Sequence, residues 1–131
     1  MKIVHFDKVA LEPVNAEGAE GTKIRWLIGQ KDGAPNFALR LFEVEPQGHT
    51  PYHVHDWEHE VYVLSGTGVL QTENGELTFK ANDAIYVDPG MPHAFKNTGT
   101  DLMKFLCIIP HEQPVLKKTL NPFADETANN C

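Results

Sequence analysis

The chain has 131 residues, 41% of them hydrophobic and 22% charged, a composition typical of one globular domain that buries its own core. Its formal net charge of -7, with no basic stripe, argues against nucleic acid and anionic membranes as partners. It shows neither a signal-peptide core nor an apolar run of membrane-spanning length, and its two distant cysteines, Cys107 and Cys131, predict a reducing cytoplasm.

Short β-strands separated by turns are predicted for most of the chain. Eight stretches rich in β-branched and aromatic residues are the expected strands: 22–29, 37–45, 60–66, 68–73, 76–80, 84–88, 93–98 and 101–109. Gly, Pro, Asn and Asp cluster between them, and Asn74-Gly75 predicts a hairpin closed by a type I′ turn. Strands at this spacing predict a sandwich or barrel rather than alternating strands and helices.

The end of the chain has a different composition. Residues 110–131 lose the alternation and gain proline, asparagine and charged side chains. We therefore expect a single domain over 1–110, followed by a C-terminal tail over 111–131 with a short helix around 114–119 and a frayed end.

Three histidines crowd into the stretch "HVHDWEHE" at 53–60. Its part "HDWEH" also fits H-x-x-E-H, the motif of a helical zinc peptidase. A helix is disfavoured here, because Pro51 lies just upstream, valines follow, and glycines occupy positions 66 and 68. The stretch is therefore expected to be part of a β-structure.

On a strand, His53 and His55 point to the same side, and a tight connection brings His59 to the start of the next strand. Three converging imidazoles suit zinc, copper, iron or nickel. The remaining histidines without a partner at ligand spacing are expected at the surface: His5, His49 and His111.

The segment "QGHTPYHVHDWEHEVYVLSG" at 47–66 resembles the first motif of the cupin superfamily, G-x5-H-x-H-x3-4-E-x6-G. Cupins are small metal-binding β-barrels. Gln47 stands where the motif has its first glycine, and His59 where it has its glutamate, with Glu60 adjacent.

The segment "NDAIYVDPGMPHAFKN" at 82–97 resembles the second cupin motif, G-x5-P-x-G-x2-H-x3-N. Asn82 replaces the first glycine and Asp88 the proline, whereas the remaining motif residues agree: Gly90, His93 and Asn97. Asn tolerates a positive φ better than most residues, so its replacement of glycine is compatible with the same turn. The order and separation of the two motifs are more specific than either motif alone.

The resemblance implies an all-β fold, the double-stranded β-helix or jelly-roll barrel. More narrowly, the chain is similar to small bacterial cupins with four histidine ligands, which would here be His53, His55, His59 and His93. In that subgroup the metal is typically manganese, and oxidative carbon–carbon cleavage is associated with the scaffold. We therefore expect one divalent transition metal per chain, with iron, nickel, copper or zinc as alternatives to manganese.

Four neutral histidines leave a divalent metal its full charge, and a six-coordinate metal would keep two adjacent positions open. From this we predict a dioxygenase-like oxidoreductase acting on a small apolar or aromatic substrate. The alternatives are a Lewis-acid lyase or isomerase, and a non-catalytic protein that binds a small ligand or a metal, because cupins include all of these.

Alternation of side chains along the strands predicts the lining of the pocket. The inward candidates are Arg40, Val61, Val63, Phe95, Phe105 and Cys107. On the strand at 37–44 two alternatives are open: either Arg40, Phe42 and Val44 face inward, or Leu39, Leu41 and Glu43 do. The first is favoured, and an inward Arg40 would bind a carboxylate or a peroxide. Two interpretations of Cys107 stay open, a residue close to the metal and a small buried filler.

An inward Arg40 also places Phe37, Leu39 and Leu41 on the outer face of their strand. These residues form an apolar strip that predicts a homodimer, because such a strip should not remain exposed on a monomer.

The acids beside the histidines are expected to be solvated or to accept N–H bonds from metal-bound imidazoles: Asp56, Glu58 and Glu60. Trp57 is expected to cap the turn or to pack at the rim of the pocket.

Overall fold

The structure is a computed structural model that describes residues 1–111 of the chain. This part contains two one-turn 3₁₀ helices, η1 (Phe6–Lys8) and η2 (Gln30–Asp32), and no α-helix. The nine strands are β1 (Glu12–Pro13), β2 (Glu20–Ile28), β3 (Phe37–His49), β4 (His59–Ser65), β5 (Thr67–Thr72), β6 (Gly75–Lys80), β7 (Ala84–Val87), β8 (Ala94–Asn97) and β9 (Met103–Pro110).

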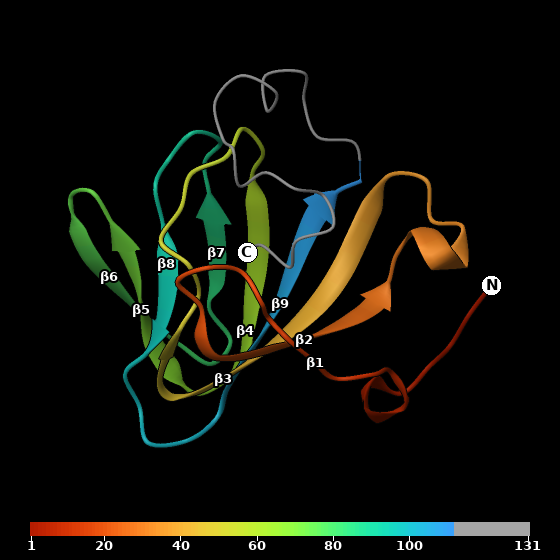
Figure 1. The fold of residues 1–131 in the computed structure, drawn as a ribbon, viewed down its shortest axis with the longest axis horizontal. Coiled ribbons are helices and arrows are strands. Elements are labelled where there is room, and N and C mark those ends of the chain that lie inside the picture. The colour runs from red at the N-terminus through yellow and green to blue at the C-terminus, as the bar shows by residue number, and fades with distance from the viewer. Residues whose placement is uncertain (112–131) are drawn as a thin grey trace.

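The strands form one antiparallel sheet that curls into a half-open barrel (Figure 1). Their order is β6-β5-β8-β3-β9-β4-β7, with β2 beside β3 and β1 beside β2. Several strands that are neighbours in the sheet are distant in the sequence, so the chain crosses repeatedly between the two halves of the barrel, as in a jelly roll. The predicted all-β barrel is confirmed, and each of the eight predicted strands is present.

Strand β3 is longer than predicted and takes part in both halves of the barrel. Its residues 37–44 pair with β9, whereas its last residue, His49, pairs with Lys96 of β8. Between these two parts, Gln47 has a φ of 72°, in the left-handed region. Such a residue bends a strand, so that it can leave one half of the barrel and join the other.

The core is a layer of side chains that crosses the barrel. Ile24, Phe42, Phe105 and Val63 pair in sequence across β2, β3, β9 and β4, and each is 0% exposed. Phe95 on β8 closes the layer from the other half, with its ring stacked 4.9 Å from that of Phe105. Complete burial of one such side chain stabilises the fold by about 1.5–3 kcal/mol.

The hairpin predicted at Asn74-Gly75 joins β5 and β6, but its turn differs from the prediction. Thr72 pairs with Gly75, and Gly75 has a φ of 115°. Asn74 does not have a positive φ, and a type I′ turn requires one at both central residues. The type I′ assignment is therefore wrong, because the glycine closes the turn as the first residue of β6 instead of occupying its centre.

The outer face of β3 also differs from the prediction. Phe37 is 62% exposed, but Leu41 is only 3% exposed. The N-terminal segment reaches this face, because the Phe6 ring lies 5.3 Å from the guanidinium of Arg25 on β2 and 4.8 Å from the ammonium of Lys104 on β9. The expectation that Leu41 is exposed is wrong, since alternation predicts an outward direction but not which other segment covers that face.

The helix predicted around 114–119, and the tail from 112 onward, lie outside the described residues. Within residues 1–111, no helix is long and apolar enough to cross a membrane.

Candidate metal centre

The four histidines predicted as ligands come from three places in the chain. His53 and His55 lie in the connection between β3 and β4, and His59 is the first residue of β4. His93 directly precedes β8 and forms a backbone bridge with His53, with N–O distances of 3.0 and 3.1 Å in the two directions. This bridge ties the two motif segments together and brings His93 beside the other three.

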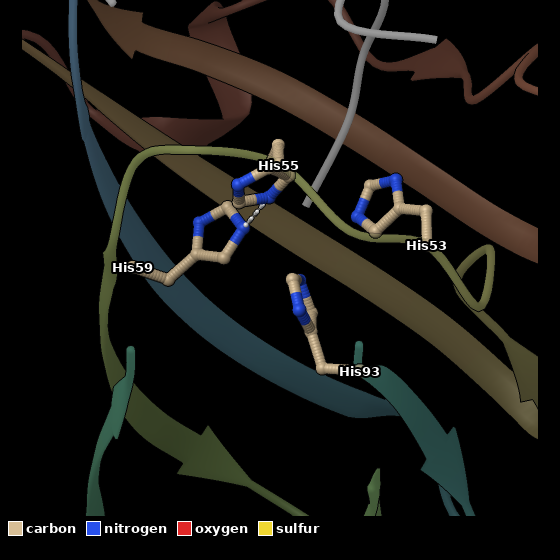
Figure 2. A group of neighbouring side chains, drawn as sticks. All are labelled: His53, His55, His59 and His93. Atoms are coloured by element: carbon tan, nitrogen blue, oxygen red, sulfur yellow. Dashed lines mark hydrogen bonds between the residues drawn. The ribbon is translucent and has the colours of Figure 1, made fainter. Parts of the chain in front are cut away.

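The four imidazoles converge on one point inside the barrel (Figure 2). All four side chains are buried, and one nitrogen from each lies within 4.8 Å of the others. The Nε2 atoms of His55 and His59 are 2.8 Å apart. Around one ion with metal–nitrogen bonds of about 2.1 Å, opposite nitrogens would be about 4.2 Å apart. The four nitrogens therefore fit a single transition-metal ion if the largest distance between them shortens by a few tenths of an ångström.

Hydrogen bonds at Nδ1 orient three of the four rings. His55 Nδ1 lies 2.8 Å from the carbonyl oxygen of Trp57, and His93 Nδ1 lies 2.8 Å from that of Met91. A carbonyl only accepts, so both rings carry the proton on Nδ1 and leave the lone pair of Nε2 for a metal. His59 has a different partner, the sulfur of Cys107, 3.2 Å from its Nδ1.

The cluster keeps His55 neutral. Burial, together with the neighbouring rings of His59, His93 and His53, lowers the pKa of His55 from 6.5 to about 2. Because an imidazole must be neutral to bind a metal, this ligand is ready for binding across the physiological pH range.

Trp57 lies against the cluster and not at its rim. Its side chain is 4% exposed, and its ring stacks on that of His55 at 4.2 Å with an interplanar angle of 7°. The ring therefore fixes the plane of His55, while the Trp57 carbonyl fixes its protonated nitrogen. Sequence reasoning placed carboxylates in this supporting role, but these Nδ1 partners are backbone carbonyls and a sulfur.

Arg40 is 0% exposed and faces into the barrel, in the predicted direction. Its Nη2 donates to the sulfur of Cys107 at 3.1 Å, and its guanidinium lies 5.4 Å from the ring centroid of Trp26 and 5.0 Å from that of Phe42. A chain of contacts therefore runs from Arg40 through Cys107 to His59. The sequence showed the inward direction of Arg40 and Cys107 but not this connection, because the two residues are 67 positions apart.

The predicted apolar pocket lining is packed core. Val63, Phe95 and Phe105 are 0% exposed, and Val61 is 4% exposed. A cavity of about 890 Å³ lies elsewhere, over an inner surface to which Trp26, Ala38 and Ile109 contribute. Ala38 and Ile109 pair across β3 and β9, two residues along from the Arg40 and Cys107 pair. The sequence did not predict that Trp26 lines this cavity. Only its position on the predicted strand 22–29, which pairs with the strand that carries Arg40, could have indicated it.

The remaining histidines lie outside the cluster. His5 is exposed and bonds Asp7 at 2.7 Å, and His49 Nδ1 lies 3.2 Å from the carbonyl oxygen of Thr50. Among the described residues, the four-histidine cluster is the one group of three or more converging metal-capable side chains.

Comparison with known proteins identifies the family. The Cupin domain model (Cupin_2) matches residues 40–109, which is more than half of the chain. The oxalate-binding protein of Thermotoga maritima is 31% identical over 112 residues, which are 82% of this chain and 92% of that protein. The chain therefore belongs to the cupin family.

Two solved structures resemble this chain over most of its length. The polyketide cyclase RemF from Streptomyces resistomycificus is 40% identical, with a TM-score of 0.82 over 87% of this chain and 82% of that one. A predicted oxalate decarboxylase from Thermotoga maritima is 25% identical, with a TM-score of 0.73 over 83% of this chain and 98% of that one. The relatives thus include enzymes and a binding protein.

Proposed function

We propose that His53, His55, His59 and His93 bind one divalent transition metal and that the protein is a metal-dependent enzyme acting on a small, mainly apolar or aromatic substrate. The observation that carries this proposal is the buried set of four converging imidazoles with no carboxylate among them. The resemblance to four-histidine cupins favours manganese, and iron, nickel, copper and zinc remain alternatives because imidazole suits several of them.

The Lewis-acid reaction has the stronger support. Four neutral ligands leave a bound divalent metal its full charge, which polarises a carbonyl or enolate oxygen of the substrate. The 40% identity with a protein that is a polyketide cyclase favours a reaction of this kind.

The proposed substrate class is argued from the cavity of about 890 Å³, whose lining contains none of the four histidines but begins two residues along β3 and β9 from the Arg40 and Cys107 pair. Trp26 contributes an aromatic wall, Ala38 and Ile109 contribute an apolar floor, and Lys31 and Asp32 lie at the polar side. A small molecule with an aromatic or apolar body and one or two oxygen substituents suits such a site.

The dioxygenase-like reaction predicted from the sequence is the second candidate. The observation in its favour is that the site offers four histidine ligands. A six-coordinate metal held by these four would keep two adjacent positions open, enough for dioxygen and substrate together. A cytoplasmic location also stays a proposal, supported by the wide separation of the two cysteines in the sequence.

The test begins with elemental analysis of protein purified without added chelator. The metal that is found is then restored to stoichiometry, and a panel of aromatic β-diketones and β-keto acids is supplied with and without dioxygen. Equal turnover under both atmospheres supports the Lewis-acid reaction, and turnover that consumes dioxygen supports the oxidative one. Absence of turnover, together with metal-dependent binding of oxalate, would contradict the enzyme proposal and favour a binding protein.

A further inference from the structure

Strand β2 contains an irregularity at the end that borders the cavity. Trp26 pairs with Arg40, and the next pair along is Ile28 with Leu39, so β2 has one residue more than β3 between these two pairs. Ordinary alternation would point Trp26 and Ile28 to the same side of the sheet. With the extra residue, Trp26 faces the barrel interior beside Arg40, whereas Ile28 lies on the outer face and is 39% exposed. Bulges of this kind often redirect a side chain next to a functional site.

The Trp26 ring contacts a buried cation and also lines the cavity. The guanidinium of Arg40, which is 0% exposed, lies 5.4 Å from the centroid of the ring, within the range of a cation–π contact. Trp26 is only partly buried against the core, and it contributes to the surface of the cavity of about 890 Å³. A large flat ring that is held from within and borders a cavity is a platform on which a second aromatic ring can stack.

This platform is connected to the metal centre across the neighbouring strands. The register between β4 and β9 places His59 beside Ile109. Ile109 in turn pairs with Ala38 on β3, and both of these residues line the cavity together with Trp26. Adjacent strands are about 4.8 Å apart, so the apolar floor begins one strand away from a ligand histidine. A substrate whose ring lies against Trp26 would therefore extend over Ala38 and Ile109 toward the metal centre.

We propose that Trp26 is a specificity-determining residue that stacks on the aromatic ring of the substrate, and that the substrate is an aryl ketone or aryl β-dicarbonyl whose oxygens face the metal centre. The inference rests on the proposed function, and it narrows the substrate class from apolar or aromatic to aromatic. An apolar wall alone would accept a phenyl and a cyclohexyl ring equally, whereas stacking on an indole ring favours the phenyl ring.

The test uses two probes that share a metal-binding part and differ in the ring. Benzoylacetone and its analogue with cyclohexyl in place of phenyl carry the same β-diketone. Their dissociation constants are measured by isothermal titration calorimetry with the metal-free protein and with the Mn²⁺-loaded protein. We expect benzoylacetone to bind about 2-fold to 12-fold more tightly than the cyclohexyl probe in both forms, which is the range that aromatic stacking supplies.

Variants at Trp26 separate stacking from plain apolar contact. Trp26→Leu should bind the two probes equally and should keep the affinity for the cyclohexyl probe within about threefold of the wild type, because leucine retains an apolar wall without a ring. Trp26→Phe should keep the preference for benzoylacetone. Tyr86→Leu is the matched control, because Tyr86 is an aromatic side chain that is 58% exposed on β7 and lies outside the lining of the cavity. It should leave both dissociation constants unchanged.

The stacking role and the proposed function fail in distinguishable ways. Mn²⁺ should tighten the binding of both probes by the same factor, because their β-diketone is the same. A phenyl preference that Trp26→Leu removes, without any tightening by Mn²⁺, would overturn the metal-dependent function and leave the stacking on Trp26 in place.

Tightening by Mn²⁺ without a phenyl preference in the wild type, or with an unchanged preference in Trp26→Leu, would overturn the stacking role. Binding of neither probe in either form would overturn it as well. If Trp26→Leu does not fold, nuclear Overhauser contacts between the phenyl protons of bound benzoylacetone and the indole protons of Trp26 in the wild type decide the question, and their absence would overturn the role.

Discussion

At the scale of single residues, histidines of identical chemistry have different surroundings. His55 is buried, stacked on Trp57 and bonded to a carbonyl, so its ring has one orientation and one tautomer. His5 is exposed, and its ring bonds Asp7, two residues along the chain. A ligand imidazole needs a fixed direction and a neutral ring, and burial in the cluster supplies both.

We predict that replacing any one ligand histidine by Ala removes most of the bound metal, because three imidazoles then leave one position to water. The measurement is metal per chain after gel filtration. His5→Ala and His111→Ala are the controls and should keep the wild-type content. Full occupancy in His59→Ala would show that Glu60 or water serves as the fourth ligand.

We further predict that acid destabilises the metal-free protein. The folded state lowers the pKa of His55 to about 2, whereas the unfolded chain has a value of about 6.5. The unfolded state therefore binds a proton that the folded state does not, so stability is complete above about pH 6.5 and declines as the pH falls toward 2. Metal should be lost in the same range, because unfolding removes the site.

The measurement is the urea midpoint at pH 7.5 and at pH 5.0. His55→Gln removes the titrating ring and should show a smaller loss of midpoint between these two values than the wild type. His5→Gln, at an exposed ring, should retain the wild-type loss. An equal loss in His55→Gln would contradict the assignment to this residue.

At the scale of elements, two turns depend on residues in the left-handed region. Gln47 and Asn82, with φ values of 72° and 74°, stand at the two positions where the cupin motifs have glycine. The backbone keeps the conformation that glycine would adopt, although the side chain has changed. Asn82 has local compensation, because its Oδ1 accepts the hydroxyl of Tyr62 at 3.1 Å and Asn tolerates this region.

We predict that Gln47→Gly stabilises the protein by about 0.5–1 kcal/mol, because relief of left-handed strain exceeds the added entropy of the unfolded chain. Asn82→Gly should be nearly neutral. Gln71→Gly, at the second-last residue of β5, is the matched control and should destabilise the protein by about 1 kcal/mol. Urea midpoints measure all three, and a loss of stability in Gln47→Gly would show that the Gln47 side chain has a contact that matters more than the strain.

At the scale of the whole molecule, one face of the barrel carries an outer apolar groove. Ile28, Leu39 and Ile108 pair in a row across β2, β3 and β9, and together with Phe37 they line a groove of about 280 Å³. Ile28, Phe37 and Ile108 are 39%, 62% and 37% exposed. A contiguous apolar surface of this kind is typical of an interface.

We predict a homodimer that buries the outer apolar groove, with a mass by light scattering of twice 14.7 kDa. Phe37→Glu should shift the protein to the mass of one chain, because a carboxylate would be buried without a partner at the interface. Leu77→Glu is a matched control, since Leu77 is also 62% exposed but lies on β6, far along the sheet from β3. A wild-type mass of one chain would contradict the dimer.

The sequence by itself determined the strands, the alternation of their side chains and the grouping of His53, His55 and His59, whereas His93 was added by the resemblance to the second cupin motif. All of these depend on local properties, because side chains alternate with a period of two and the ligands follow short motif spacings. Even the choice between a helix and a strand around His55 needed only the proline, valines and glycines nearby.

Only the tertiary structure decided how deep each inward side chain lies and what it contacts. Phe105 and Cys107 alternate identically along β9, yet Phe105 is packed into the core and Cys107 contacts a ligand ring. That contact joins residues 48 positions apart, and no strand pattern predicts that Phe6 of the N-terminal segment lies against Arg25 and Lys104 on the neighbouring strands. These contacts are set by the register between strands and by the path of distant segments. Register and path depend on how the whole chain packs to bury its apolar surface, so no short stretch of sequence determines them alone.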